Sequence, residues 1–164
     1  MIELFLINLI LWKGDFKSLN VRQLYDYTIS IQVSDEGLIL KGKPEDEGHS
    51  AAWLYLPENL KILSSDTLFI KIKVNKNTVR LRYFYLSEDE RVYLLGIKYI
   101  ESARDWQEII IPLNCAKPFY SNNFPWSLVP DKKPSMYIFI ENNYPGDFDV
   151  EIKNIKLKGW REEK

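Results

Sequence analysis

Residues 105–113 read DWQEIIIPL, residues 136–140 read MYIFI and residues 148–159 read FDVEIKNIKLKG. Within these runs apolar side chains alternate with polar ones or form short continuous apolar stretches, and turn residues separate the runs. Such patterns predict strands of an antiparallel sheet rather than helices. The closing third of the chain therefore indicates an all-β fold.

The same pattern continues upstream, most clearly over residues 68–74 and 79–85. Polar clusters at 75–77 and 87–90 predict that these runs form hairpins with one buried face. Counting apolar runs along the whole chain gives about nine or ten strands. The remaining runs lie at 28–33, 37–41, 51–56 and 91–99. Together they predict an all-β, two-sheet antiparallel β-sandwich of the jelly-roll type.

The ends of the chain complete this outline. Residues 1–11 predict a buried first strand, because Glu3 and Asn8 interrupt the apolar run and no basic segment or cleavage site marks a signal peptide. Residues 20–27 are the only segment that suits a short helix. At 164 residues the chain is expected to form a single domain over residues 1–164, with a frayed tail at 160–164.

Composition disfavours several classes of function. The formal net charge is -1 and the charges are interspersed, so we expect no nucleic-acid partner. The apolar amino terminus is too short to span a bilayer, so we expect no membrane partner. Cys115 and His49 are the single Cys and His, which argues against Cys/His zinc sites and nucleophile–histidine catalysis. The aromatic content of 14% instead suggests a ring-lined binding surface.

These runs resemble the jelly-roll, galactose-binding-like carbohydrate-binding modules that are attached to polysaccharide-degrading enzymes. The resemblance covers nearly all of the chain. It rests on the runs at 51–56 and 68–74, on DWQEIIIPL at 105–113, on Gly146-Asp147-Phe148 and on IKNIKL at 152–157. It implies a noncatalytic carbohydrate-binding module, covalently linked to a catalytic domain of a glycoside hydrolase. It also implies an extracellular or cell-surface location, although residues 1–11 carry no signal-peptide pattern.

The resemblance also bears on cofactors. Many relatives carry an acidic residue just before the Asn-Ile pair at 154–155, where it helps to hold a structural calcium ion. Here that position is Lys153, whose ammonium group cannot ligate Ca²⁺. Asp15, Asp149 and Glu151 lie nearby in the pattern, so a shifted site stays open. We expect no cofactor and no calcium at the family position.

Sugar binding requires aromatic rings that stack on a pyranose, next to polar side chains that bond its hydroxyls. Trp53 and Tyr55 are candidate rings because they alternate with Leu54 and Leu56, and so project outward if the leucines are buried. The alternative is that a loop covers this face and both rings belong to the core.

A second candidate face lies on the outward phase of the central runs. It consists of Arg80, Arg82 and Phe84, the neighbouring Lys71 and Lys73, and Tyr93. Cations beside rings suit the recognition of hydroxyl or uronate groups. The alternative is an ordinary solvated face, above all for the lysines.

The segment 114–135 is rich in proline and lacks periodicity, and connections of this length are often functional. Its aromatic residues are either platforms for a ligand or a small cluster that orders the loop. We predict an ordering role for Phe119 and Phe124, and retain Trp126 as a binding candidate beside Tyr120. Trp106, which opens a strand, is expected to be structural.

The predicted function is noncatalytic binding of a polysaccharide or oligosaccharide, with no enzymatic activity. The candidate carbohydrate-binding residues are Trp53, Tyr55, Arg82, Phe84, Tyr93 and Trp126. The alternative is a structural or protein-interaction β-sandwich domain of a larger enzyme that binds no sugar. A third hypothesis is a small glycosidase, since Glu108, Glu141 and Glu151 lie on predicted strands and such enzymes use two carboxylates across a cleft. No segment resembles the catalytic strands of jelly-roll glycosidases.

Overall fold

A computed structural model describes residues 6–14, 16, 20–22, 29–46, 50–56, 62–63, 65–86, 92–113, 117–118 and 136–162. Within these residues, two six-stranded antiparallel sheets form, and no helix. Sheet A has the order β3 (Ile29–Ser34), β4 (Gly37–Gly42), β12 (Phe148–Glu162), β6 (Thr67–Lys76) and β9 (Gln107–Pro112), with β1 (Leu6–Lys13) also paired to β12. Sheet B has the order β10 (Lys117–Pro118), β8 (Val92–Ile100), β7 (Val79–Leu86), β11 (Met136–Asn142), β5 (Ser50–Leu56) and β2 (Asn20–Arg22).

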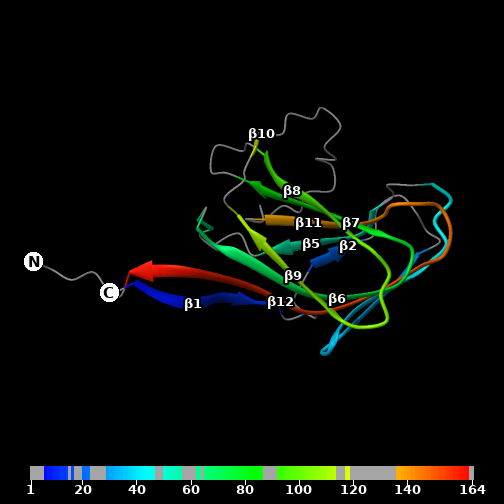
Figure 1. Cartoon of the computed structure of the whole chain (residues 1–164), viewed down its shortest axis with the longest axis horizontal. Coiled ribbons are helices and arrows are strands. Elements are labelled where there is room, and N and C mark those ends of the chain that lie inside the picture. The colour runs from blue at the N-terminus through cyan, green and yellow to red at the C-terminus, as the bar shows by residue number, and fades with distance from the viewer. Residues whose placement is uncertain are drawn as a thin grey trace, which may run out of the picture.

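The two sheets pack face to face around a hydrophobic core (Figure 1). Alternate residues of β6 from Leu68 to Val74 are at most 1% exposed, and the residues between them are half-buried or exposed. From sheet B, alternate residues of β11 from Met136 to Ile140 join the same core cluster. Burial of this apolar surface is the main force that holds the sandwich together. The predicted all-β sandwich is confirmed.

A β-bulge at Asn154 keeps the apolar side chains of β12 on the core side. The register with β6 shifts between Lys153 and Ile155, and Asn154 has a φ of 52°. Asparagine tolerates this left-handed conformation better than most residues. Ile152 and Ile155 are therefore both buried although they are three positions apart.

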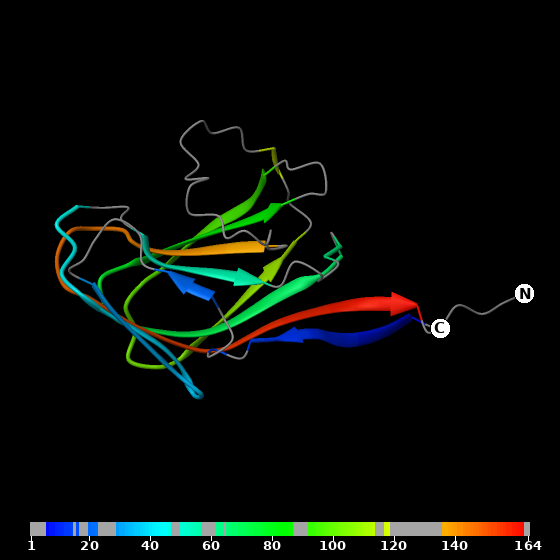
Figure 2. The ribbon, with the colours of Figure 1, turned by 180° about the vertical axis from the view of Figure 1, so that it is seen from behind.

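The start of β1 and the end of β12 form a two-stranded ribbon that projects beyond the body of the sandwich (Figures 1 and 2). The prediction of a buried first strand is wrong here, because Leu9 and Ile10 are 42% and 60% exposed. The predicted fraying of the tail is also not seen over the described residues, since β12 continues to Glu162 and Trp160 pairs with Asn8. Each strand satisfies the backbone hydrogen bonds of the other along the ribbon.

A buried ion pair anchors this ribbon to the body of the sandwich. The Asp66 side chain is 0% exposed and accepts hydrogen bonds from Arg161 Nη1 at 2.7 Å and Arg161 Nη2 at 2.9 Å. It also accepts a bond from the backbone N–H of Leu63 at 2.8 Å. The hydrogen bond to Asp66 raises the pKa of Arg161. A Cβ atom at Gly159 would collide with the Asp66 carboxylate, so the close approach requires glycine.

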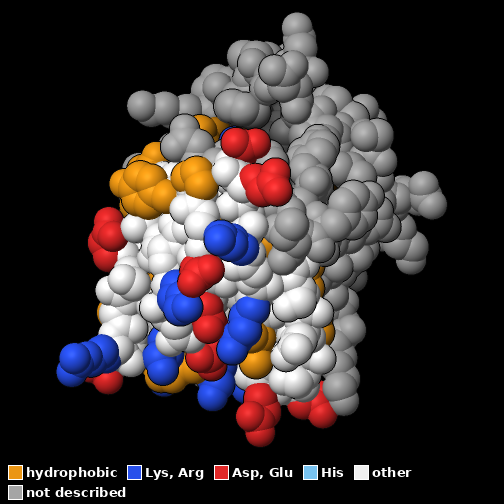
Figure 3. Space-filling model, turned by 90° about the vertical axis from the view of Figure 1, so that its right-hand side faces the viewer, with side chains coloured by type: hydrophobic (Ala, Val, Ile, Leu, Met, Phe, Trp, Pro, Cys, Tyr) orange, Lys and Arg blue, Asp and Glu red, His pale blue; other side chains and the backbone are white. Residues whose placement is uncertain are grey.

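Connections between the sheets meet at the opposite end of the sandwich. Asn77 has a φ of 74°, and its side chain donates to the backbone oxygen of Tyr144 at 2.8 Å, which joins the β6–β7 and β11–β12 connections. Asn142 donates to the backbone oxygen of Asp46 at 2.6 Å and so adds the β4–β5 connection. Figure 3 shows acidic and basic side chains interspersed over this end.

The predicted hairpin between residues 68–74 and 79–85 is wrong. The turn at 75–77 carries the chain from β6 in sheet A to β7 in sheet B, and the two strands do not pair. A polar turn reverses the backbone locally, whereas the choice of sheet depends on distant strands. By contrast, β7 and β8 do form the predicted antiparallel pair.

The short elements were harder to predict. Residues 20–22 form strand β2 and not the start of a helix, while residues 23–28 lie outside the described residues. Strands β2 and β10 each extend an edge of sheet B and carried no alternating pattern long enough to recognise. No helix in the described part of the chain has the length and hydropathy needed to cross a bilayer. The single-domain boundaries stay a prediction.

Candidate functional site

The outer face of sheet B brings together charged and aromatic residues from three neighbouring strands. Val79 and Leu81 lie in the core, so Arg80, Arg82 and Phe84 occupy the outer side of β7, as predicted. Strand β11 lies beside them and contributes three further residues. In register, Glu141 pairs with Arg80, Phe139 with Arg82 and Tyr137 with Phe84.

Glu141 is the centre of this face. Its side chain is 0% exposed, and Arg80 and Arg82 both donate to it. The Nε atoms of Arg80 and Arg82 lie 3.1 and 2.6 Å from the same oxygen, Oε2, and Arg82 Nη2 also donates to Oε1. Arg82 therefore forms a bidentate pair whose orientation is defined by geometry as well as charge. One buried carboxylate holds two half-buried guanidinium groups side by side.

The aromatic residues on β7 and β11 support these arginines. The guanidinium carbon of Arg82 lies 5.9 Å from the ring centre of Phe84 and 5.5 Å from that of Phe139. The two rings meet edge to face at 4.9 Å and 61°. Phe84 is only 1% exposed, so it does not offer an open ring to a sugar, contrary to the prediction. It packs beneath Arg82 and favours the cation there.

Strand β8 supplies the exposed part of the face. Tyr99 and Ile97 are 55% and 46% exposed, and they pair in register with Arg80 and Arg82. Residues directly opposite each other in an antiparallel pair lie close together on one face. An exposed phenol ring thus stands beside an oriented guanidinium group, which is the combination that sugar binding requires.

Glu141 was missed as a binding residue because it lies on β11, whose pairing with β7 no local pattern reports. Tyr93 was preferred to Tyr99 because strict alternation gives both residues to one face, whereas a bulge in β8 separates them. The register between β7 and β8 shifts at Leu95, so that Tyr93 pairs with Tyr85 and not with Leu86, its partner in an unshifted register. Along β7, Tyr85 alternates with Arg80, Arg82 and Phe84 and is in phase with the core residues Val79 and Leu81. The Tyr93 side chain lies outside the described part of the structure. A single sequence carries no signal that places such a bulge.

The other aromatic candidates stay predictions. In register, Trp53 pairs with Phe139 and Tyr55 with Tyr137, which gives both positions to the outer face of sheet B. Their side chains are not among those that the structure describes, and Trp126 lies wholly outside the described residues.

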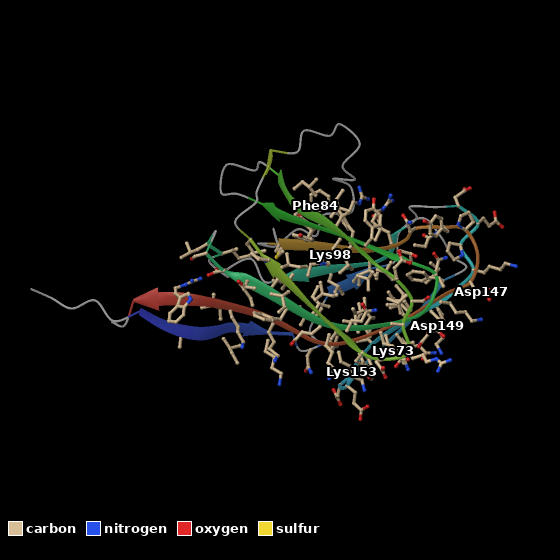
Figure 4. The ribbon with its side chains drawn as sticks, in the orientation of Figure 1. Lys73, Phe84, Lys98, Asp147, Asp149 and Lys153 are labelled. Atoms are coloured by element: carbon tan, nitrogen blue, oxygen red, sulfur yellow. The ribbon has the colours of Figure 1, made fainter. Side chains whose placement is uncertain are left out.

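The lysines of the predicted face belong elsewhere. Lys71 and Lys73 lie on β6 in sheet A, whereas Arg80 and Arg82 lie in sheet B. Figure 4 shows Lys73 across the sandwich from Phe84. The assumption that residues 68–74 and 79–85 share a sheet caused this error. Lys73 instead lines a shallow hollow of about 410 Å³ with Asn75, Ser102, Ala103 and Arg104.

The three glutamates considered for a catalytic pair do not come together. Glu141 lies in sheet B and is committed to two arginines, while Glu108 and Glu151 lie in sheet A. Glu108 pairs in register with Lys71 and Glu151 with Lys73, so β6 and its lysines separate the two acids. This differs from the two carboxylates that face each other across a glycosidase cleft.

We still expect no calcium ion at Lys153, because of what its ammonium group contacts. Its Nζ atom lies 4.9 Å from the ring centre of Trp106, so the ammonium group occupies the space above that ring. Asp15, a candidate for a shifted site, lies outside the described residues, and among those described no group of three or more His, Cys, Asp or Glu side chains could hold a metal ion. A second cation would be repelled by Lys153, and Ca²⁺ requires six to eight oxygen ligands.

We therefore predict that the midpoint of thermal unfolding is the same in EDTA and in millimolar CaCl₂. If a calcium site existed, a free Ca²⁺ concentration one hundred times its Kd would add about 2.7 kcal/mol to the free energy of unfolding. A calcium-dependent rise in the midpoint of several degrees, reversed by EDTA, would show that a shifted site exists. Magnesium chloride at the same ionic strength is the control for a general salt effect.

Comparisons with known proteins support the fold. No family model and no curated protein sequence matches this chain. The apo form of the module CBM1 of BiXyn10A matches with a TM-score of 0.55 at 12% identity, over 90% of this chain and 96% of that one. The CBM22-1–GH10 modules of xylanase 10B from Clostridium thermocellum, in complex with xylohexaose, give 0.54 at 13% identity, over 91% of this chain and 28% of that one. A variant of CBM29-2 in complex with cellulohexaose gives 0.53 at 12% identity, over 93% and 91%.

At 12 to 13% sequence identity, the structural similarity shows a shared fold and nothing further. The chain has the two-sheet β-sandwich that these carbohydrate-binding modules share. The matched structures include isolated binding modules and chains that also carry a glycoside hydrolase module.

Proposed function

We propose that this chain is a noncatalytic carbohydrate-binding module that recognises a polysaccharide or oligosaccharide through the outer face of sheet B. The observation that carries the proposal is the exposed ring of Tyr99 beside Arg80 and Arg82, which buried Glu141 holds in place. A phenol ring can stack on the apolar face of a pyranose, and guanidinium groups donate to its oxygens. Two of the matched modules are complexes with xylohexaose and cellulohexaose, which supports the same class of ligand.

The geometry favours binding over chemistry. The arginines are oriented before a ligand arrives, which lowers the entropic cost of binding. Covalent linkage to a glycoside hydrolase would raise the local concentration of its substrate without any chemical step in this module. The proposal includes an extracellular or cell-surface location, where such polysaccharides occur.

A second candidate is a protein-interaction domain that binds no sugar. It is favoured by the projecting ribbon, where Leu9, Ile10 and Trp160 are 42%, 60% and 51% exposed. Exposed apolar residues that gather on one element are typical of protein contacts. This candidate predicts no affinity for any polysaccharide.

Affinity electrophoresis against soluble glucan, mannan, xylan and pectin tests the proposal. We expect retardation by at least one polymer, and a loss of affinity of about tenfold, or 1.4 kcal/mol, for Tyr99→Ala. Tyr144→Ala is the matched control, because Tyr144 is also 55% exposed but lies between β11 and β12, away from this face.

Absence of retardation on every polymer would overturn the proposal and favour the second candidate. Equal losses for Tyr99→Ala and Tyr144→Ala would place binding elsewhere on the molecule. Release of reducing sugar from the same polymers would instead indicate a glycosidase.

A further inference from the structure

We infer that the outer face of sheet B selects acidic glycans, in which a uronate carboxylate binds Arg80 and Arg82 while its ring stacks on Tyr99. This inference rests on the proposed function, because it specifies the ligand of the same site. It follows from the balance of charge, the unused hydrogen-bond donors and the position of Tyr99.

Among the residues that the structure describes, the cluster holds two cations, Arg80 and Arg82, and one anion, Glu141. Arg80 and Arg82 both donate to Oε2 of Glu141, and their side chains are 25% and 31% exposed. Two guanidinium groups held beside one oxygen repel each other, and a single carboxylate offsets only one of their charges. Partial burial makes the remaining charge more costly than it would be in water. Within the described part of the chain, this face therefore presents a positive charge that a second carboxylate would complement.

The N–H groups of Arg80 and Arg82 that do not donate to Glu141 suit a planar anion. Within the described residues, Arg80 donates to Glu141 through Nε alone, so both of its Nη groups are left for a partner outside the cluster. Arg82 uses Nε and Nη2 and keeps Nη1. Guanidinium groups bind carboxylates through two parallel hydrogen bonds, and such charge-assisted bonds are shorter and about twice as strong as those between neutral groups.

Tyr99 sets the place of the sugar ring. It pairs in register with Arg80, and the residue is 55% exposed, whereas the side chain of Arg80 is 25% exposed. A pyranose stacked on this phenol ring lies beside the guanidinium group of the opposite strand. The carboxylate at C5 of a uronate extends from the edge of the ring and can reach this group, whereas the hydroxymethyl group of a hexose brings no charge.

The test compares each acidic polymer with its own neutral form. Glucuronoxylan and polygalacturonate are titrated beside the same polymers after carboxyl reduction, by isothermal calorimetry at low ionic strength. We expect at least one acidic polymer to bind about tenfold more tightly than its reduced form. This ratio should fall as salt is raised, because screening weakens exposed charge pairs.

Variants assign the preference to the cluster. Arg80→Gln should bring the ratio close to one while binding of the reduced polymer persists, because Arg82 still pairs with Glu141 in this variant. Arg80→Lys keeps the positive charge but loses the planar guanidinium group that can donate two parallel hydrogen bonds. This variant should retain part of the preference for the acidic polymer. Lys71→Gln removes the same charge from an exposed position on sheet A and should leave the ratio unchanged.

The outcomes separate the two proposals. Equal binding of acidic and reduced polymers, or binding of neutral glycans alone, would overturn the acidic preference and leave the proposed function standing. If Arg80→Gln and Lys71→Gln lowered the ratio of acidic to reduced binding equally, the acidic preference of this site would also be overturned. The preference would then depend only on the net charge of the protein. Failure to bind any acidic, reduced or neutral polymer would overturn both proposals.

Discussion

Glu141→Gln is expected to lower the free energy of unfolding by about 3 kcal/mol, at the lower end of the range for breaking a buried ion pair. The side chain is 0% exposed and accepts hydrogen bonds from Arg80 and Arg82. The variant leaves two half-buried cations without their common anion and turns one acceptor oxygen into a donor that faces them. The arginines are 25% and 31% exposed, so water relieves part of the cost. Urea unfolding monitored by tryptophan fluorescence measures the change.

Glu108→Gln is the matched control for this variant. Glu108 is exposed on β9, and the same change there is expected to stay within about 0.5 kcal/mol. Equal losses of stability for the two variants would contradict the central role given to Glu141. Glu141→Gln should also weaken polysaccharide binding under conditions where it remains folded, since Arg80 and Arg82 lose the group that orients them.

Asp66→Asn is expected to cost about 3 kcal/mol for the same physical reason. The Asp66 side chain is 0% exposed and accepts three hydrogen bonds, two from Arg161 and one from the backbone of Leu63. An asparagine can accept through only one of its two side-chain heavy atoms, so one donor loses its partner and Arg161 loses its anion. Because the pKa of Arg161 is raised in the folded protein, the contribution of Arg161 to stability is present at neutral pH and is lost as the pH rises through that pKa.

The effect of Asp66→Asn should appear in the ribbon as well as in global stability. Hydrogen exchange of the amides in β1 and in the end of β12 is expected to speed up, because Arg161 ties this ribbon to the body. Gly159→Ala should act in the same direction, since its Cβ atom would meet the Asp66 carboxylate. Asp105→Asn, at an exposed position, is the control. Ribbon amides that exchange at the same rate in Asp66→Asn and in Asp105→Asn would rule out the anchoring role.

The long alternating strands were predictable because side chains along a strand alternate between its two faces. The run at 68–74 shows this most clearly, since its alternate residues are buried in the core, namely Leu68, Ile70, Ile72 and Val74. Predictions failed where a bulge changes that alternation. In β8 the shift at Leu95 changes the register, so that Tyr99 pairs with Arg80 while Tyr93 pairs with Tyr85.

The candidate site was predictable only in part. The outward phase of Arg80, Arg82 and Phe84 followed from the burial of alternate residues on β7. Glu141 looked like an ordinary surface glutamate because it alternates with isoleucines. Its role depends on the pairing of β11 with β7, which are separated by β8 to β10 along the chain. No local pattern reports which distant strand becomes a neighbour.

The sequence by itself determined the fold class, the long strands and the faces that several of them bury. It did so because the alternation of apolar and polar residues along a strand decides which side chains are buried in the core. Only the tertiary structure decided that the chain crosses from sheet A to sheet B at 75–77, that the lysines and arginines lie on opposite sheets, and that Glu141 joins Arg80 and Arg82. These features depend on strand register and sheet order, which arise from the packing of segments far apart in the chain.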